Sequence, residues 1–156
     1  MMRKKKGHNN VFHAVNFAVK LLKATLDNRE KIKKEIEKSL DVHDPHFVEI
    51  YGAGHTHKFS IIVMELAATS LEKMICDKED EIELEEIEKI IEHVGQCMEY
   101  MADKFCHRDI KPSNILLFNN GDYKLTDLGV SVKLNSTSST AYVVKGTEEY
   151  LSHNFK

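Results

Sequence analysis

Residues 107–114 read His-Arg-Asp-Ile-Lys-Pro-Ser-Asn, and residues 127–129 read Asp-Leu-Gly. These two short segments carry the polar groups that phosphoryl transfer needs. Asp109 can accept a hydroxyl proton, and Lys111 can hold a phosphate. Magnesium prefers hard oxygen ligands, which are offered here by Asn114 and Asp127. The segments therefore predict a phosphoryl-transfer site in which Asp109 and Lys111 are the catalytic residues.

Residues 105–129 as a whole resemble the catalytic and metal-binding loops of eukaryotic protein kinases. The lysine two residues after the aspartate resembles the serine/threonine class of that family. The resemblance implies ATP and Mg²⁺ as cofactors and protein serine or threonine hydroxyls as acceptors. It assigns the two oxygen ligands of the metal to Asn114 and Asp127. His107 is expected to pack and to form hydrogen bonds rather than to act as an acid or base.

The same resemblance extends to the activation segment. It implies that Arg108 pairs with a phosphate there, because a guanidinium binds phosphate through two hydrogen bonds. Thr147 lies in Gly-Thr-Glu-Glu-Tyr-Leu, residues 146–151, which is similar to the segment that receives the substrate hydroxyl. Residues Ser136 to Thr140 are plausible phosphorylation sites for an upstream kinase, although a loop rich in serine and threonine is as often simply flexible.

Lys20 lies in an alternating stretch, residues 17–20, that predicts a strand. On one interpretation its aliphatic stem covers apolar surface at a sheet edge. On the other, the stretch resembles the kinase strand whose lysine pairs with the α- and β-phosphates of ATP. The expected partner is Glu35, because about 100° per residue places it beside the apolar stripe of the next helix. By the same arithmetic two other glutamates of that helix face solvent, Glu30 and Glu37.

Periodicity predicts the remaining elements. A capping-box pattern at Asp27 and Glu30 predicts a helix that ends at Asp44-Pro45. Strands are expected at residues 47–51 and 59–64, joined by a turn at 52–55. A long helix is expected along one apolar stripe, made of Leu84, Ile87, Ile91, Val94, Met98 and Met101. A short hairpin follows at residues 115–118 and 123–125.

These elements predict an α+β chain with a protein-kinase-like, two-lobed fold. We expect a small N-lobe at residues 1–64 and a partial C-lobe at residues 65–156, so that the C-lobe is incomplete. Met64-Glu65-Leu66-Ala67 resembles the hinge between the lobes, with Met64 as gatekeeper. The resemblance implies that the backbone carbonyl of Glu65 and the backbone amide of Ala67 hydrogen-bond adenine. An ordinary strand end is the alternative for this segment.

The chain departs from the kinase pattern in three places. The glycine-rich phosphate loop would fall on Lys4, Lys6 and Asn9, so its three glycines are missing. The family's Ala-Pro-Glu is replaced by Ser-His-Asn at residues 152–154, and the sequence ends at Lys156, where a complete kinase continues. The alternative function is therefore a weak or inactive truncated kinase that serves as a nucleotide- or partner-binding module.

Composition bounds the partners. The chain has 156 residues, of which 42% are hydrophobic, and a formal net charge of −3. Such a small charge predicts no general attraction to nucleic acid or membrane surfaces. Three cysteines without metal-finger spacing suit free thiols in a reducing cytosol. We therefore expect a cytoplasmic protein, with the nucleus as the alternative, that acts on a protein substrate without nucleic acid or membrane insertion.

Overall fold

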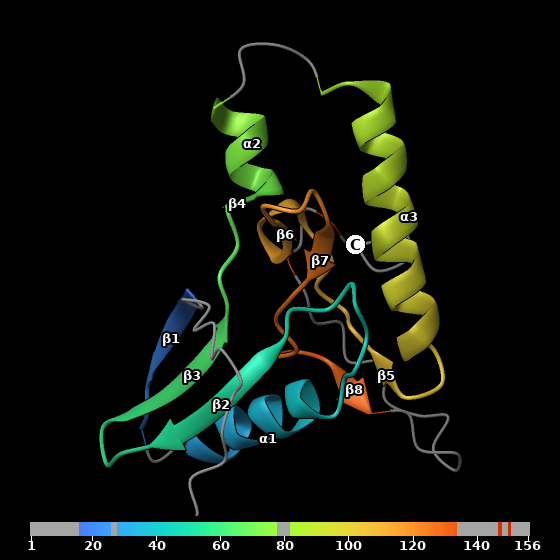
Figure 1. The fold of residues 1–156 in the computed structure, drawn as a ribbon. Coiled ribbons are helices and arrows are strands. Elements are labelled where there is room, and N and C mark those ends of the chain that lie inside the picture. The colour runs from blue at the N-terminus through green and yellow to red at the C-terminus, as the bar shows by residue number, and fades with distance from the viewer. Residues whose placement is uncertain (1–15, 26–27, 78–81, 134–146, 148–149, 151–156) are drawn as a thin grey trace, which may run out of the picture.

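A three-stranded antiparallel sheet covered on one face by a helix forms the first part of the molecule (Figure 1). The computed structural model describes residues 16–25, 28–77, 82–133, 147 and 150. The strands are β1 (Phe17–Lys23), β3 (Phe59–Glu65) and β2 (Ile50–His55), in the spatial order β1-β3-β2. Helix α1 (Arg29–Leu40) packs on the sheet and buries Ile32 and Ile36 against Ile62. Exposure alternates along β1, so Lys20 shares the partly buried face of the strand.

The second part combines two helices with short strands. Helix α2 (Leu71–Asp77) follows β4 (Thr69–Ser70), and the long helix α3 spans Leu84–Met101. Strand β4 pairs with β6 (Ile115–Leu117), which pairs with β7 (Tyr123–Leu125). A 3₁₀ turn at Pro112–Asn114 precedes β6, and β5 (Phe105–Cys106) pairs with β8 (Val132–Lys133). The α+β architecture, the long helix and the hairpin at β6 and β7 agree with the prediction from sequence.

Each part has its own hydrophobic core. The smaller core joins α1 to the sheet, and the larger one gathers side chains from α2, α3, β6 and β7. Val42 and Phe47, which follow α1 in the chain, belong to the larger core. Backbone hydrogen bonds strengthen this attachment, because Leu125 accepts from Val48 at 2.9 Å and donates to His46 at 2.8 Å. The segment after α1 therefore ties the first part to the strand that leads to Asp127.

Two local expectations were wrong, and a third falls on a residue outside the described part of the chain. Helix α1 ends at Leu40 rather than at Asp44-Pro45, because Val42 is already buried in the larger core. Residues 52–55 belong to β2 instead of forming a turn, since pairing with β3 holds their backbone extended. The turn lies at residues 56–58, where the Thr56 hydroxyl accepts a hydrogen bond from the backbone N–H of Phe59 at 2.9 Å. Asn28 is the N-cap of α1, and the expected cap at Asp27 lies outside the described residues.

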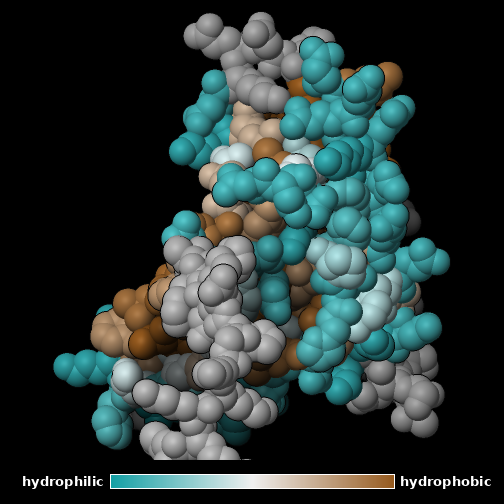
Figure 2. All heavy atoms as spheres, viewed as in Figure 1, coloured by the Kyte–Doolittle hydropathy of each residue, from teal (hydrophilic) through white to brown (hydrophobic). Residues whose placement is uncertain are grey.

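The apolar stripe expected along α3 is divided between two faces. The buried side chains are Val94, Cys97 and Met101. The other members of the expected stripe are exposed, namely Leu84, Ile87, Ile91 and Met98. Figure 2 shows mainly hydrophilic residues over α3 in this view, whereas hydrophobic residues gather over β1 and β3. In the part of the chain that the structure describes, no helix has both the length and the apolar character needed to span a membrane.

Candidate active site

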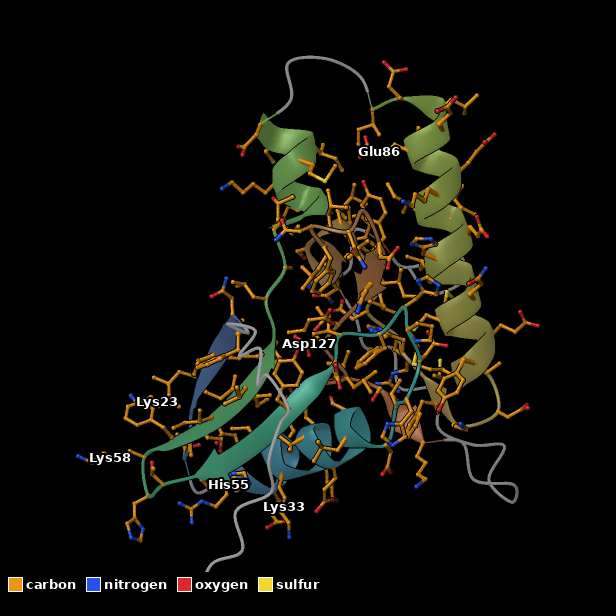
Figure 3. The ribbon with its side chains drawn as sticks, in the orientation of Figure 1. Lys23, Lys33, His55, Lys58, Glu86 and Asp127 are labelled. Carbon is orange, nitrogen blue, oxygen red and sulfur yellow. The ribbon has the colours of Figure 1, made fainter. Side chains whose placement is uncertain are left out.

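Lys20 joins two carboxylates that lie far apart in the sequence. Its Nζ donates to Glu35 Oε1 at 3.1 Å and to Asp127 Oδ2 at 3.2 Å. Strand β1 supplies the lysine, α1 supplies Glu35, and the loop after β7 supplies Asp127. Figure 3 shows Asp127 between the first sheet and the β6–β7 hairpin. The structure therefore brings three of the predicted residues together and pairs Lys20 with Glu35, as the helical arithmetic indicated.

Electrostatics favour the charged form of this lysine. Burial alone lowers the pKa of Lys20, but the carboxylates of Asp127 and Glu35 outweigh it, so the pKa is raised overall. The Glu35 side chain is only 11% exposed, whereas that of Asp127 is 37% exposed. Lys20 is thus a fixed cation beside one enclosed carboxylate and one that solvent or a ligand can reach.

Asp109 meets Lys111 and Thr147 in a second cluster. Asp109 Oδ1 accepts from the Thr147 hydroxyl at 2.7 Å and from the Thr147 backbone N–H at 2.9 Å. Lys111 Nζ lies 3.0 Å from Asp109 Oδ2 and donates to Thr147 Oγ1 at 2.7 Å. A hydroxyl therefore fits between the carboxylate and the ammonium group, at distances suited to proton transfer.

Asp109 is held as a carboxylate. Desolvation raises the pKa of Asp109, but the hydrogen bonds from Thr147 and Lys111 act in the opposite direction and lower it overall. His107 lies beneath the loop, 5% exposed, with Nε2 3.1 Å from the carbonyl oxygen of Thr126. Burial lowers the pKa of His107, so the neutral ring is favoured. These contacts agree with the packing role expected for this histidine.

Asn114 and Asp127 form a donor set that suits magnesium. The amide nitrogen of Asn114 donates to Asp109 O at 2.8 Å and to Asp109 Oδ2 at 3.1 Å, which leaves its carbonyl oxygen for a metal. The backbone N–H of Thr126 donates to the backbone carbonyl oxygen of Asn114 at 3.0 Å, which brings the segment before Asp127 next to the one that carries Asn114. Asp127 has φ 71°, a left-handed conformation that few non-glycine residues adopt. One amide oxygen and one accessible carboxylate are ligands of the hard type that Mg²⁺ takes.

Arg108 also has a left-handed backbone, with φ 68°. Its Nε atom is buried and has no hydrogen-bond partner among the described residues. Residues 134–146, which contain the expected phosphorylation sites Ser136 to Thr140, lie outside the described part of the chain. The pairing of Arg108 with a phosphate therefore stays a prediction.

The expected hinge connects the two parts of the fold. Met64 lies opposite Ala18, one residue before the β1–β3 pairing ends at Glu65, and packs against the smaller core. The Glu65 side chain accepts from Lys124 Nζ at 2.9 and 2.7 Å, and Lys124 also lies over the ring of Phe118. Ala67 follows in the partly buried connection to β4. The Lys124–Glu65 ion pair was not anticipated from sequence, because 59 residues separate the two side chains.

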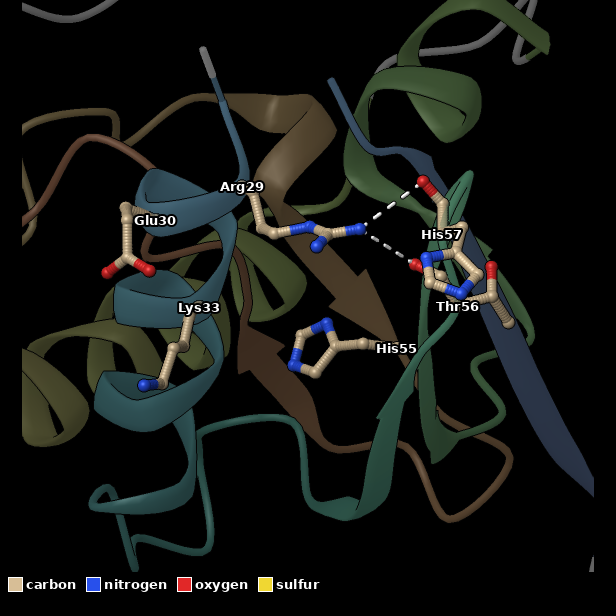
Figure 4. A pocket seen from close by; sticks show the side chains of 6 residues that line it. All are labelled: Arg29, Glu30, Lys33, His55, Thr56 and His57. Atoms are coloured by element: carbon tan, nitrogen blue, oxygen red, sulfur yellow. Dashed lines mark hydrogen bonds between the residues drawn. The ribbon is translucent and has the colours of Figure 1, made fainter. Parts of the chain in front are cut away.

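An open hollow of about 460 Å³ lies at the other end of α1 (Figure 4). Arg29 crosses this hollow and donates to the backbone carbonyls of Thr56 and His57 at 3.2 and 3.3 Å. Glu30, Lys33 and His55 also line it. The residues expected to carry the chemistry lie elsewhere, at the junction of the two parts.

Comparisons with known proteins agree with this geometry. The family model described as protein kinase domain matches residues 6–154. Over 134 residues the chain is 37% identical to a dual specificity mitogen-activated protein kinase kinase 1 of Dictyostelium discoideum, covering 82% of this chain and 20% of that protein. It is 29% identical over 140 residues to mitogen-activated protein kinase kinase 1 of Arabidopsis thaliana, covering 87% of this chain and 40% of the relative. A third relative, the serine/threonine-protein kinase dst1 of Dictyostelium discoideum, is 33% identical over 150 residues, which cover 91% of this chain and 20% of that kinase.

Proposed function

Because the chain belongs to the protein kinase domain family, we propose that it transfers the γ-phosphoryl group of ATP to serine or threonine hydroxyls of a protein substrate. The chain spans between about a fifth and two fifths of the length of the curated relatives described above. The activity, substrate and partners given to the chain are therefore proposals, because the relatives are much longer than this chain.

The contact that supports the proposal most is the bridge from Lys20 to both Glu35 and Asp127. A lysine between a helix carboxylate and a metal-loop carboxylate is the arrangement that orients phosphates for transfer. The two partners come from different elements of the fold, and Asp127 is held on a backbone in a left-handed conformation. The loop after β7, which carries Asp127, also meets the Asp109 cluster through the backbone bond between Thr126 and Asn114.

Each residue then has a defined task. Asp109 accepts the proton of the acceptor hydroxyl, and its lowered pKa keeps it ionised at neutral pH. Lys111 places positive charge beside that hydroxyl, where Thr147 now donates to Asp109. Lys20 holds phosphate oxygens, and Glu35 keeps the lysine charged and oriented. The Glu65 carbonyl and the Ala67 amide hold adenine.

Asn114 and Asp127 hold Mg²⁺ through the amide oxygen and the carboxylate. Bound magnesium neutralises charge that develops on the transferred phosphoryl group. Lys20 contacts the same Asp127 carboxylate at 3.2 Å, so a metal bound there would share or replace this contact. Because the glycines of a phosphate loop are missing, we propose that ATP binds more weakly than to a kinase that has them.

A phosphate-transfer assay tests this proposal. The chain is incubated with γ-labelled ATP, Mg²⁺ and a library of peptides that contain serine, threonine or tyrosine, and the labelled amino acid is identified. We expect label on serine or threonine and a loss of about 10²–10⁴-fold in Asp109→Asn. Asp103→Asn, an exposed aspartate elsewhere, is the matched control. If the parent chain and Asp109→Asn transfer the same amount of label to the peptides, the transfer does not depend on Asp109. That result would reject the proposed enzyme in favour of a binding module.

A further inference from the structure

Helix α1 touches the metal loop, here residues 127–131, a second time, one turn beyond Glu35. Lys38 Nζ donates to the backbone carbonyl of Ser131 and lies 3.1 Å from Ser131 Oγ. The two residues are 93 positions apart in the sequence, and the contact is partly buried. A charged donor on a carbonyl oxygen forms a stronger hydrogen bond than a neutral donor. This contact therefore joins the α1 helix directly to the segment that follows Asp127.

Ser131 is a well-fixed anchor for that contact. Its side chain is 5% exposed, and its hydroxyl donates to the carbonyl oxygen of Leu128 at 2.8 Å. Leu128 is fully buried in the larger core, directly after Asp127. The residues after Ser131 form β8, which pairs with β5 beside the catalytic loop. The second part of the fold thus holds Ser131 in place as the partner of Lys38.

Lys38 and Glu35 are three residues apart, so both project from the same side of α1. Glu35 already approaches the metal loop, because a Cβ atom at Gly129 would lie 3.2 Å from Glu35 Oε2 and 3.0 Å from Asp127 Oδ1. The neighbouring Ser39 is buried, and its hydroxyl donates to the Glu35 carbonyl at 2.9 Å. One side of the helix therefore meets residues 127–131 at two successive points.

We propose that Lys38 is a positioning residue that holds α1 against the metal loop and so keeps Glu35 within reach of Lys20. The inference rests on the proposed function only where it concerns nucleotide, since the contact itself requires no ligand. Without Lys38, α1 keeps its apolar contacts with the sheet but loses a polar link to the second part. Glu35 then spends less time beside Lys20, and phosphate binding weakens.

Hydrogen exchange tests the link without nucleotide. Lys38→Met preserves most of the length of the side chain and removes its charge. We expect amide exchange at residues 35–40 and 128–131 to become about tenfold faster, with β6 and β7 unchanged. Lys33→Met is the matched control, because Lys33 lies on the same helix but faces the hollow shown in Figure 4 and reaches Glu37 only at 3.9 Å. Unchanged exchange at both segments in Lys38→Met would overturn the proposal.

A double-mutant cycle on Mg·ATP affinity, measured by calorimetry, tests the consequence. Lys38→Met should weaken binding about five- to tenfold, and Lys38→Arg should restore most of it, because arginine can also donate to the Ser131 carbonyl. The effect should vanish in a Glu35→Gln background if Lys38 acts through Glu35. The same loss in both backgrounds would show a general structural role and reject the positioning role. A parent chain that binds no Mg·ATP would reject the proposed function, while the exchange experiment would still decide whether the link exists.

Discussion

Glu35→Gln should destabilise the parent chain but stabilise a chain in which Lys20 is already replaced with methionine. In the parent chain the ammonium group lies 3.1 Å from Glu35 and 3.2 Å from Asp127. At an effective dielectric constant of about 20, the pair with Glu35 is worth about 5 kcal/mol of Coulomb energy. Desolvation offsets much of this, so we expect Lys20→Met to lower the free energy of unfolding by about 2 kcal/mol.

The two carboxylates become unfavourable neighbours once the lysine is removed. Each has an oxygen within 3.2 Å of Nζ, so these oxygens lie roughly 6 Å apart at most, a repulsion of about 3 kcal/mol before solvent screening. Since Asp127 is 37% exposed, screening reduces this to about 1 kcal/mol. Glu35→Gln should therefore destabilise the parent chain by about 1 kcal/mol and stabilise Lys20→Met by a similar amount.

Urea unfolding of the parent, the two single variants and the double variant measures this cycle. The account predicts that the double variant is more stable than Lys20→Met alone. If the two losses simply add, the charges of Lys20 and Glu35 are not coupled and the central triad is wrong. Lys33→Met, whose surface pair with Glu37 is 3.9 Å long, should change stability by less than about 0.5 kcal/mol.

Three further predictions concern stability and the hinge. Burial, and to a smaller extent the nearby His46, lowers the pKa of His93 in the folded chain below its ordinary value of 6.5. As the pH falls below about 6.5, His93 therefore takes up a proton more readily in the unfolded chain than in the folded one, and the free energy of unfolding should fall. Urea unfolding at several pH values should show a shallower fall in His93→Asn, which does not titrate there. Tyr123→Phe removes a 2.6 Å hydrogen bond to Glu86 and should lower the free energy of unfolding by about 1.5 kcal/mol in the same assay. Lys124→Met removes the ion pair of Glu65 at the proposed hinge, and calorimetry should show ATP binding about threefold weaker, whereas an equal affinity would separate this ion pair from the proposed adenine site.

Local spacing was sufficient to find most of the candidate site. Asp109, Lys111 and Asn114 lie within one short segment, and the structure brings them together with contacts of about 3 Å. Helical periodicity selected Glu35 over Glu30 and Glu37, and only Glu35 is turned inward toward Lys20. The proximity of these side chains agrees with the prediction because neighbouring residues and a regular helix determine where side chains point, whereas their catalytic roles stay predictions.

Contacts between distant segments could not be predicted in this way. Lys38 meets Ser131 across 93 residues, and Lys124 meets Glu65 across 59. The extension of β2 through Gly52 and Gly54 also depends on its partner, because pairing with β3 overrides the local preference of glycine for turns. The stripe along α3 was misassigned for a related reason, since a helix with apolar residues on two faces does not reveal which face the core will cover.

A calorimetric titration of ATP in the presence and absence of Mg²⁺ tests the central claim most directly. The account predicts that the parent chain and Asp109→Asn bind Mg·ATP with nearly equal affinity, because Asp109 acts on the acceptor hydroxyl. In Asp127→Asn, ATP binding should no longer depend on Mg²⁺, because that carboxylate is the proposed metal ligand. No magnesium-dependent binding by the parent chain at millimolar nucleotide, or equal defects in both variants, would contradict the account.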